Sequence, residues 1–558
     1  MPREPATNEP PTGARGNALN AISARYRLAA GHLFGPTSTP LAAAALLLAW
    51  ALGTRRYLMD GSFWESEAFI AHNLLKLEPA ALFGPLLTDH SFPRLYLWVI
   101  SQGMHLFGYE TLVLRALPWF FFMVAMALLV WLLGLRFRDR PGLLAVALML
   151  ALAAPVHFAY AAMLKQYTLE LALTLALIAV PDDRLDQILR EGRGRARLWL
   201  FALPCLLSYG YAIVLIARVV GWWGHGALQR RFFVDGRSAT LLALTMAAVV
   251  GGLWWIELRH TAGTDAVFRF WTKCIVGAGP ASAGDLLGQL LTGWWTHPSG
   301  WGDSQALLGG PGQLILLALL GLGVVNAVLR GLREGSDAAN ATERRWGSRS
   351  LAFAAIPVGL FLASLLFGYP ICANNLTLFA LLPIVCLIVE GMAMVLRGIE
   401  AKAGHRVGQA FQAVAVLTLI PILVSNVVFQ WTTPPPGDLR PLLPAIEQRP
   451  NLPLAVAACS RVQVETLPEW QGRDDLHYFN EGILDFRTGQ LPSAPRFLMI
   501  SASSVFLCPW FLQQMTTRGG KVRTLSSFPR SGALWLVDYP LDAPREWPLP
   551  KPDRPAAP

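Results

Sequence analysis

The sequence predicts an all-α membrane protein that crosses the bilayer many times and carries a small soluble α/β domain near its C-terminal end. Composition is the first observation, because 54% of the 558 residues are hydrophobic and 15% are charged, whereas soluble domains carry about 25% charged residues. Long apolar runs recur between residues 36 and 430, and roughly 20 apolar residues can span a bilayer. The third observation is the Pro-rich region after residue 431, where short strand-like runs replace the long apolar ones.

Eleven apolar segments are candidate transmembrane helices. Two of them are short and are separated by Ser208, Tyr209 and Gly210, so they form either a tight hairpin of short helices or one long helix. The eleven segments are 36–53, 112–135, 141–161, 167–181, 198–208, 210–224, 238–257, 311–329, 350–368, 375–396 and 408–430.

Basic residues predict how these spans are oriented. Six segments contain 23 of the 46 Lys and Arg residues in about one-sixth of the chain. With eleven spans all six fall on one side of the membrane, which the positive-inside rule assigns to the cytoplasm. Arg55 and Arg56 are the local exception. The six segments are 1–33, 136–140, 182–197, 229–237, 330–349 and 397–406.

The chain then divides into four parts, with the soluble domain on the outer, non-cytoplasmic side. Its strand-like runs are Leu454–Ala458, Arg496–Ile500 and Ala533–Val537, which indicate an α/β or β-rich fold. The four parts are a disordered cytoplasmic tail (1–33), a transmembrane domain (34–430) with outer loops 54–111 and 258–310, the soluble domain (431–545) and a disordered tail (546–558).

Charge and cysteine content argue against nucleic-acid binding and against a metal site built from cysteines. The net charge of +10 is explained by basic cytoplasmic loops, so no nucleic-acid partner is predicted. The six cysteines show no metal-ligand spacing. Cys459 and Cys508 lie in the soluble domain, where an oxidising compartment would allow a disulfide between them.

Polar residues on the outer side form the candidate site. Glu65 and Glu67 stand in the stretch FWESEAFIA, where a carboxylate beside the membrane can act as a general base or hold a divalent cation. The alternative is that both are solvated loop residues. Asp89, His90 and Arg94 gather before the next apolar run; a histidine there either contacts substrate, binds metal or is a satisfied loop residue.

Two further clusters lie in outer turns. Lys165, Gln166 and Tyr167 separate two spans, and a basic residue on this side suits a lipid phosphate, although an interfacial lysine also snorkels. Tyr369 and Asn375 flank the turn between two later spans, where Asn and Pro are also simply turn residues. The aromatic residues of loop 258–310 lie on the membrane surface or stack on sugar rings.

The distribution of these residues favours an enzyme over a pump. No P-loop, GxGxxG or HExxH motif is present in a usable context. A secondary transporter places ionisable residues near the bilayer midplane, whereas the polar clusters here lie at the outer ends of spans. We therefore expect an enzyme that acts at the outer interface on a lipid-linked substrate, with a lipid-linked-sugar flippase or other transporter as the alternative.

The order of these motifs resembles a known family. An acidic xEA motif in the first outer loop is followed by FPRLYLW, by KQYTLE and by LTLFALLP. This order is similar to that of polytopic glycosyltransferases of the C-type fold, and most of all to the bacterial branch with protein O-mannosyltransferases and the aminoarabinose transferase of lipid A. The resemblance covers roughly residues 35–400.

The resemblance implies an inverting glycosyltransferase of the bacterial inner membrane, with its N-terminus in the cytoplasm and its soluble domain in the periplasm. A polyprenyl-phosphate sugar would be the donor and an envelope lipid, glycan or protein the acceptor. Ser66 stands where the family has aspartate, so Glu67 is the retained acid, as base or metal-positioning group for Mg or Mn, and Glu65 a substitute. A non-catalytic family member is the alternative.

The remaining roles follow from the same resemblance. Lys165, helped by Arg94, would contact the donor phosphate. The other candidates would line the donor or acceptor pocket; they are Asp89, His90, Gln166, Tyr167, Tyr369 and Asn375.

Overall fold

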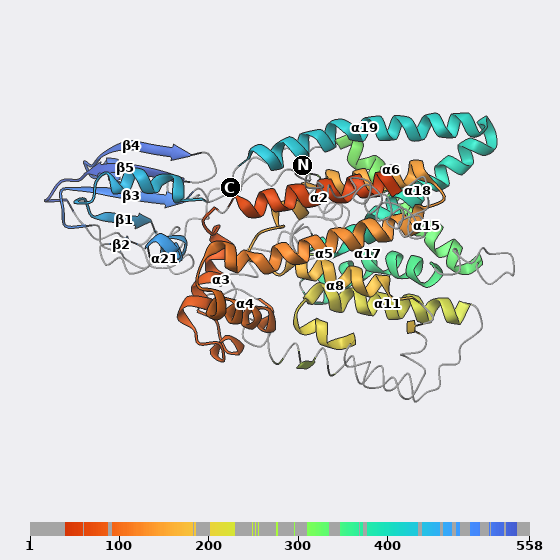
Figure 1. Ribbon diagram of the computed structural model, residues 1–558, viewed down its shortest axis with the longest axis horizontal. Helices are drawn as coiled ribbons and strands as arrows, with labels where there is room; N and C mark the ends of the chain where they lie inside the picture. The colour runs from red at the N-terminus through yellow and green to blue at the C-terminus, as the bar shows by residue number, and fades with distance from the viewer. Residues whose placement is uncertain are drawn as a thin grey trace, which may run out of the picture.

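The structure of the protein is a computed structural model in which a helical bundle carries a β-sheet domain at one end (Figure 1). It describes residues 39–59, 61–87, 92–181, 184–185, 201–228, 310–333, 346–367, 369–371, 377–433, 438–457, 461–470, 476–479, 492–502, 515–528 and 532–543, with a few single positions between them.

The first half of the bundle follows the predicted spans, with breaks where proline or polar residues interrupt them. The predicted segment 141–161 is divided, because α6 ends before Pro155 and a short α7 follows. The described helices are α2 (Thr39–Leu58), α3 (Glu65–Lys76), α4 (Arg94–Phe107), α5 (Thr111–Phe137), α6 (Pro141–Ala153), α7 (Pro155–Ala159), α8 (Tyr167–Ala179) and α11 (Tyr209–Leu228), with 3-10 turns η1 (Ala81–Phe83) and η3 (Leu203–Leu206).

The second half of the bundle contains four long helices. They are α15 (Gly310–Arg333), α17 (Gly347–Phe367), α18 (Leu381–Ala403) and α19 (His405–Thr432), with η6 (Leu378–Ala380) before α18. Helices therefore stand at nine of the eleven predicted spans. Most of 238–257 lies outside the described residues, and the described part of 198–208, residues 201–208, contains the 3-10 turn η3. The turn at Leu207 and Ser208 separates η3 from α11, which contradicts one long helix over 198–224.

Four of the described helical segments are long and apolar enough to cross a membrane. They are Thr111–Phe137, Ser348–Leu365, Leu378–Ala403 and His405–Thr432. Shorter apolar helices cover Pro141–Ala153, Tyr167–Ala179 and Leu314–Arg330. The number of eleven spans stays a prediction.

The bundle core includes one very close approach of two helices. A Cβ atom added to Gly323 of α15 would lie 1.8 Å from the Leu387 carbonyl oxygen of α18, and one added to Gly391 would lie 1.9 Å from the Leu319 oxygen. Small residues let backbones meet in apolar surroundings. These two glycines therefore set the distance between α15 and α18.

Arg56, part of the exception to the predicted charge bias, joins the ends of α2 and α19. Its Nε donates to Gln430 Oε1 at 2.8 Å and its Nη1 to the Thr433 carbonyl at 2.7 Å. An arginine here satisfies a carbonyl that a helix end leaves without a partner. The contact puts the C-terminal ends of both helices on the same side, as the predicted topology requires.

The C-terminal region forms a five-stranded mixed sheet, as the strand-like runs predicted. The strand order is β2-β1-β3-β5-β4, with β1 parallel to β2 and β3, and β5 antiparallel to β3 and β4. The strands are β1 (Leu454–Ala457), β2 (Leu476–Phe479), β3 (Arg496–Ala502), β4 (Lys521–Phe528) and β5 (Gly532–Asp538), with α20 (Leu443–Glu447), α21 (Arg461–Glu465), η7 (Arg440–Leu442) and η9 (Pro468–Trp470).

The sheet domain is docked onto the segment that leads into α3. Ser62 N–H donates to Asp438 Oδ1 at 2.7 Å, and Leu439 N–H donates back to Ser62 Oγ at 2.8 Å. The Tyr109 hydroxyl donates to the Thr466 carbonyl at 2.8 Å. Figure 1 shows the sheet beside α3, at one end of the bundle. The domain therefore contacts the segment that holds the candidate acid Glu67.

Candidate functional site

Glu67, in the first turn of α3, lies at the end of the bundle that carries the sheet domain (Figure 1). It is the third residue of α3, and its Oε2 accepts a hydrogen bond from the Trp64 backbone N–H at 3.1 Å. A glutamate at this position reaches back to cap the helix start. The side chain is 1% exposed, so its charge needs a partner inside the protein.

Arg115 of α5 is that partner. Its Nε donates to Glu67 Oε1 at 3.1 Å and its Nη2 to Oε2 at 2.8 Å. The same guanidinium donates to the carbonyls of Gly61 and Ser62 and lies 5.2 Å from the centre of the Phe63 ring. Arg115 therefore fixes the whole turn before α3. The LR step Leu114-Arg115 is part of the resemblance, but the sequence assigned Arg115 no role, because an arginine in an apolar run gives no sign of its partner.

Glu67 also holds the turn that contains the candidate phosphate ligand. Its Oε1 accepts the backbone N–H of Leu164 at 2.6 Å. With two bonds from Arg115 and one from Trp64, the carboxylate accepts four hydrogen bonds, which fills the roughly four lone-pair positions of a carboxylate. Glu67 thus links α3, α5 and the segment before α8.

Lys165 points into an aromatic pocket and does not snorkel. It is 5% exposed, and its Nζ lies 4.7 Å from the centre of the Phe92 ring and 5.9 Å from that of Tyr167. Such cation–π contacts stabilise an ammonium group away from water. Phe92 also precedes Arg94, a residue 1% exposed at the start of α4, so this pocket joins two of the predicted clusters.

Polar groups surround this pocket. Gln166 and Tyr167 are buried. Burial, followed by the nearby Glu67 carboxylate, raises the pKa of the Tyr96 hydroxyl well above its usual range. Among the residues that the structure describes, Tyr96 Oη and Gln166 Oε1 are buried without a hydrogen-bond partner. A neutral hydroxyl donor and an amide acceptor can recognise the hydroxyl groups of a ligand.

Tyr369 and Glu170 complete the centre on its other side. Burial, then the charge of Glu170, then Tyr167, raises the pKa of Tyr369 well above its usual range. Glu170 is buried, and its Oε1 accepts the Ser208 hydroxyl at 3.0 Å and the Gly210 backbone N–H. Glu170 therefore caps the start of α11.

Several predicted site residues lie outside the described part of the chain. Asp89, His90 and Asn375 do, as do Cys459 and Cys508. Only the backbone of Glu65 and Ser66 is described, and it forms the start of α3. The structure therefore joins Glu67 to the turn before Lys165 and places Lys165 against Tyr167 and Phe92. Arg94 and Gln166 are buried beside these residues in the sequence.

The residues described here do not fit a divalent cation at Glu67. Four N–H donors already occupy its two oxygens, and a cation would have to displace a paired arginine. No group of three His, Cys, Asp or Glu side chains with metal-binding geometry occurs among the described residues. Dependence on Mg or Mn stays a prediction.

Comparison with known proteins finds similar solved structures. No protein-family model and no curated protein matches the chain. Among solved structures, ArnT from Cupriavidus metallidurans is similar, both bound to undecaprenyl phosphate and in the apo state, at TM-scores of 0.41 and 0.40. Both matches have 12% sequence identity and cover 89% of this chain and 97% of that chain. Because both TM-scores lie below 0.5, the function is argued below from contacts within this chain.

Proposed function

We propose that the protein is a membrane glycosyltransferase that moves a sugar from a polyprenyl-phosphate donor to an acceptor at the outer face of a bacterial inner membrane. One observation carries the proposal: Lys165 lies buried among aromatic rings beside an apolar helical bundle. A lipid carrier would approach such a centre from the bilayer. A buried cation beside it would bind the phosphate that the lipid carries.

Lys165 and Arg94 would act on the leaving group. As the bond between the anomeric carbon and the phosphate oxygen breaks, negative charge grows on the polyprenyl phosphate. A fixed cation in a water-poor site stabilises that charge more than water does. Phe92 and Tyr167 hold the ammonium in place through its cation–π contacts, so no reorganisation is needed at the moment of transfer.

The acceptor hydroxyl or amine would attack the anomeric carbon from the opposite face and invert it. Its proton then needs a base. Glu67 is fully occupied by four donors, which supports a positioning role. The described hydrogen bonds to Glu170 both reach Oε1. Oε2 of Glu170 is therefore our preferred proton acceptor, with Glu67 as the alternative that the sequence favoured.

Release of polyprenyl phosphate tests the proposal. The full-length protein in nanodiscs is incubated with a set of polyprenyl-phosphate sugars and envelope extract, and the lipid phosphate is measured. We expect release by the native protein and about a 100-fold loss in Lys165→Gln, as for a charge-assisted contact of about 3 kcal/mol. Lys76→Gln, at the exposed end of α3, is the matched control and should release at the native rate.

Two outcomes contradict the proposal. Donor binding without release would identify a non-catalytic protein. Equal release by Lys165→Gln and the native protein would show that the aromatic pocket is not the phosphate site.

A further inference from the structure

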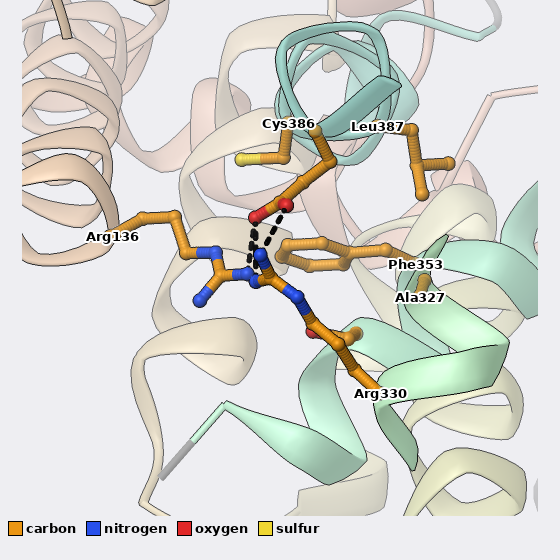
Figure 2. Close-up of a pocket in the computed structure, with 8 residues that line it drawn as sticks. Arg136, Ala327, Arg330, Phe353, Cys386 and Leu387 are labelled. Carbon is orange, nitrogen blue, oxygen red and sulfur yellow. Dashed lines mark hydrogen bonds and ion pairs between the residues drawn. The ribbon is translucent and has the colours of Figure 1, made fainter. Parts of the chain in front are cut away.

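A second buried polar centre lies at the end of the bundle opposite the sheet domain. Thr111, at the start of α5, contacts Arg440 of the domain at 2.9 Å. Arg136 lies near the other end of α5, about 38 Å away at 1.5 Å per residue. There it meets Glu390 of α18 and Arg330 of α15 (Figure 2).

One carboxylate is shared by several donors in this centre. Arg136 Nη2 donates to Glu390 Oε1. Arg330 reaches both oxygens, at 3.2 Å from Nη1 and 3.1 Å from Nη2. Asn326 Nδ2 donates to Oε2 at 2.9 Å. Both oxygens of Glu390 therefore already accept hydrogen bonds, and a third arginine would find few free acceptor positions on this carboxylate.

Arg140 adds a third positive charge. It lies past the end of α5, directly before α6, and is exposed, and its charge acts on both Glu390 and Arg330. Its neighbour Arg138 instead pairs with Asp139 at 3.3 Å. Arg397 adds a fourth positive charge, because its Nη2 donates to Asn326 Oδ1 at 3.0 Å and its charge acts on Arg330. Around Glu390 the described residues thus include four arginines against one carboxylate.

A small open pocket exists where these charges converge. Arg136, Arg330 and Glu390 line it together with Ser350 and Phe353. Figure 2 shows the two guanidinium groups meeting the carboxylate, with the Phe353 ring beside them. An anion at this pocket would lie beside two partly buried guanidinium groups, and the charge of Arg140 acts on the same network.

We propose that this arginine pocket binds a phosphate group. Guanidinium groups bind phosphate through paired N–H donors, and the excess positive charge would be offset by the bound anion. Two sources share this chemistry: the headgroup of an anionic phospholipid and free inorganic phosphate. Arg330 is the last residue of the apolar helical segment Leu314–Arg330, so the pocket lies where an apolar segment ends. This position favours the lipid, because its headgroup would lie at the charges and its acyl chains beside the apolar helix.

Binding of defined phosphates tests the site. The full-length protein in neutral detergent is titrated with short-chain phosphatidylglycerol, with phosphatidylcholine of the same chain length, and with inorganic phosphate. We expect phosphatidylglycerol to bind most tightly. Arg140→Gln should weaken it about fivefold, as expected for one basic residue at a membrane surface, and Arg330→Gln at least as much. Arg138→Gln is the matched control and should change nothing.

Glu390→Gln separates a phosphate site from a purely structural ion pair. Removing the carboxylate leaves the arginines with more uncompensated charge, so phosphatidylglycerol should bind more tightly. A folding defect cannot produce this gain. Inorganic phosphate that binds as tightly as the lipid, with the same arginine dependence, would support the site and identify free phosphate as its ligand. Equal binding of both lipids, or affinity unchanged in Arg140→Gln and Arg330→Gln, would overturn the proposal.

Discussion

Arg115 and Glu67 form a bidentate salt bridge between α5 and the first turn of α3, with N–O distances of 3.1 and 2.8 Å. Both side chains are buried, so the pair is shielded from salt. Since Glu67 also holds the Leu164 N–H, the bridge fixes the turn in which Lys165 follows. Through this salt bridge Glu67 helps to hold in place the aromatic residues and Lys165.

Glu67→Gln should destabilise the protein by about 3 kcal/mol, because breaking one side of a buried pair leaves an uncompensated charge. Thermal unfolding in detergent measures this loss, and the exposed Glu78→Gln is the control. The double variant Glu67→Gln, Arg115→Met removes both charges and should recover much of the stability and part of the transfer. A double variant that is stable but fully inactive would instead identify Glu67 as the base.

Phe92→Leu should weaken donor binding about fivefold. The substitution removes the ring whose centre lies 4.7 Å from Lys165 Nζ, and a desolvated cation–π contact contributes about 1 kcal/mol. Titration with polyprenyl phosphate measures the effect. Phe83→Leu, in the half-exposed turn η1, should bind like the native protein. Unchanged binding in Phe92→Leu would show that this ring does not position the ammonium.

Asp438→Asn should loosen the sheet domain from the bundle. The Asp438 carboxylate accepts the Ser62 N–H at 2.7 Å, and a hydrogen bond to a charged group contributes about 1.5–3 kcal/mol. Amide exchange in residues 61–64 should then accelerate about tenfold or more. Asp542→Asn, near the end of the described sheet domain, should leave this exchange unchanged. Equal exchange in both variants would contradict a docking role for Asp438.

Tyr109→Phe should change the response to alkaline pH. Burial, followed by the Glu469 charge, raises the Tyr109 pKa above its ordinary value of 10.0. A raised folded-state pKa stabilises the protein fully below the unfolded pKa, and the stability is lost as pH rises through the folded pKa. The Tm of the native protein should therefore fall more steeply above about pH 10 than that of Tyr109→Phe. Parallel curves would contradict the linkage.

Much of the architecture could be predicted because apolar length and charge bias depend on local sequence. Helices α5, α15 and α18 lie where apolar runs placed them, and β1, β3 and β5 follow the apolar strand-like runs. β4 was missed, because its sequence KVRTLSSF is largely polar. Its place in the sheet comes from pairing with β5, which local sequence does not encode.

The candidate site could be predicted only in part, for a similar reason. Glu67 and Lys165 were visible as charged residues in unusual places. Their environment was not, because Arg115 lies 48 positions from Glu67 and Leu164 lies 97 positions away. Whether a carboxylate is free to accept a proton depends on these distant donors. The positioning role that we propose for Glu67 is argued from contacts made by tertiary packing.

Gly323→Ala and Gly321→Ala should have opposite effects, although the two glycines lie two positions apart in α15. The added methyl at Gly323 would meet the Leu387 carbonyl oxygen at 1.8 Å, whereas nothing lies within 4 Å of the one at Gly321. Forcing two packed helices apart costs about 1–3 kcal/mol, while alanine is about 1 kcal/mol better than glycine inside a helix. The Tm in detergent should therefore fall for Gly323→Ala and rise slightly for Gly321→Ala. Since α15 and α18 carry Arg330 and Glu390, Gly323→Ala should also weaken phosphatidylglycerol binding. An equal Tm in the two variants would show that α15 and α18 do not meet at Gly323.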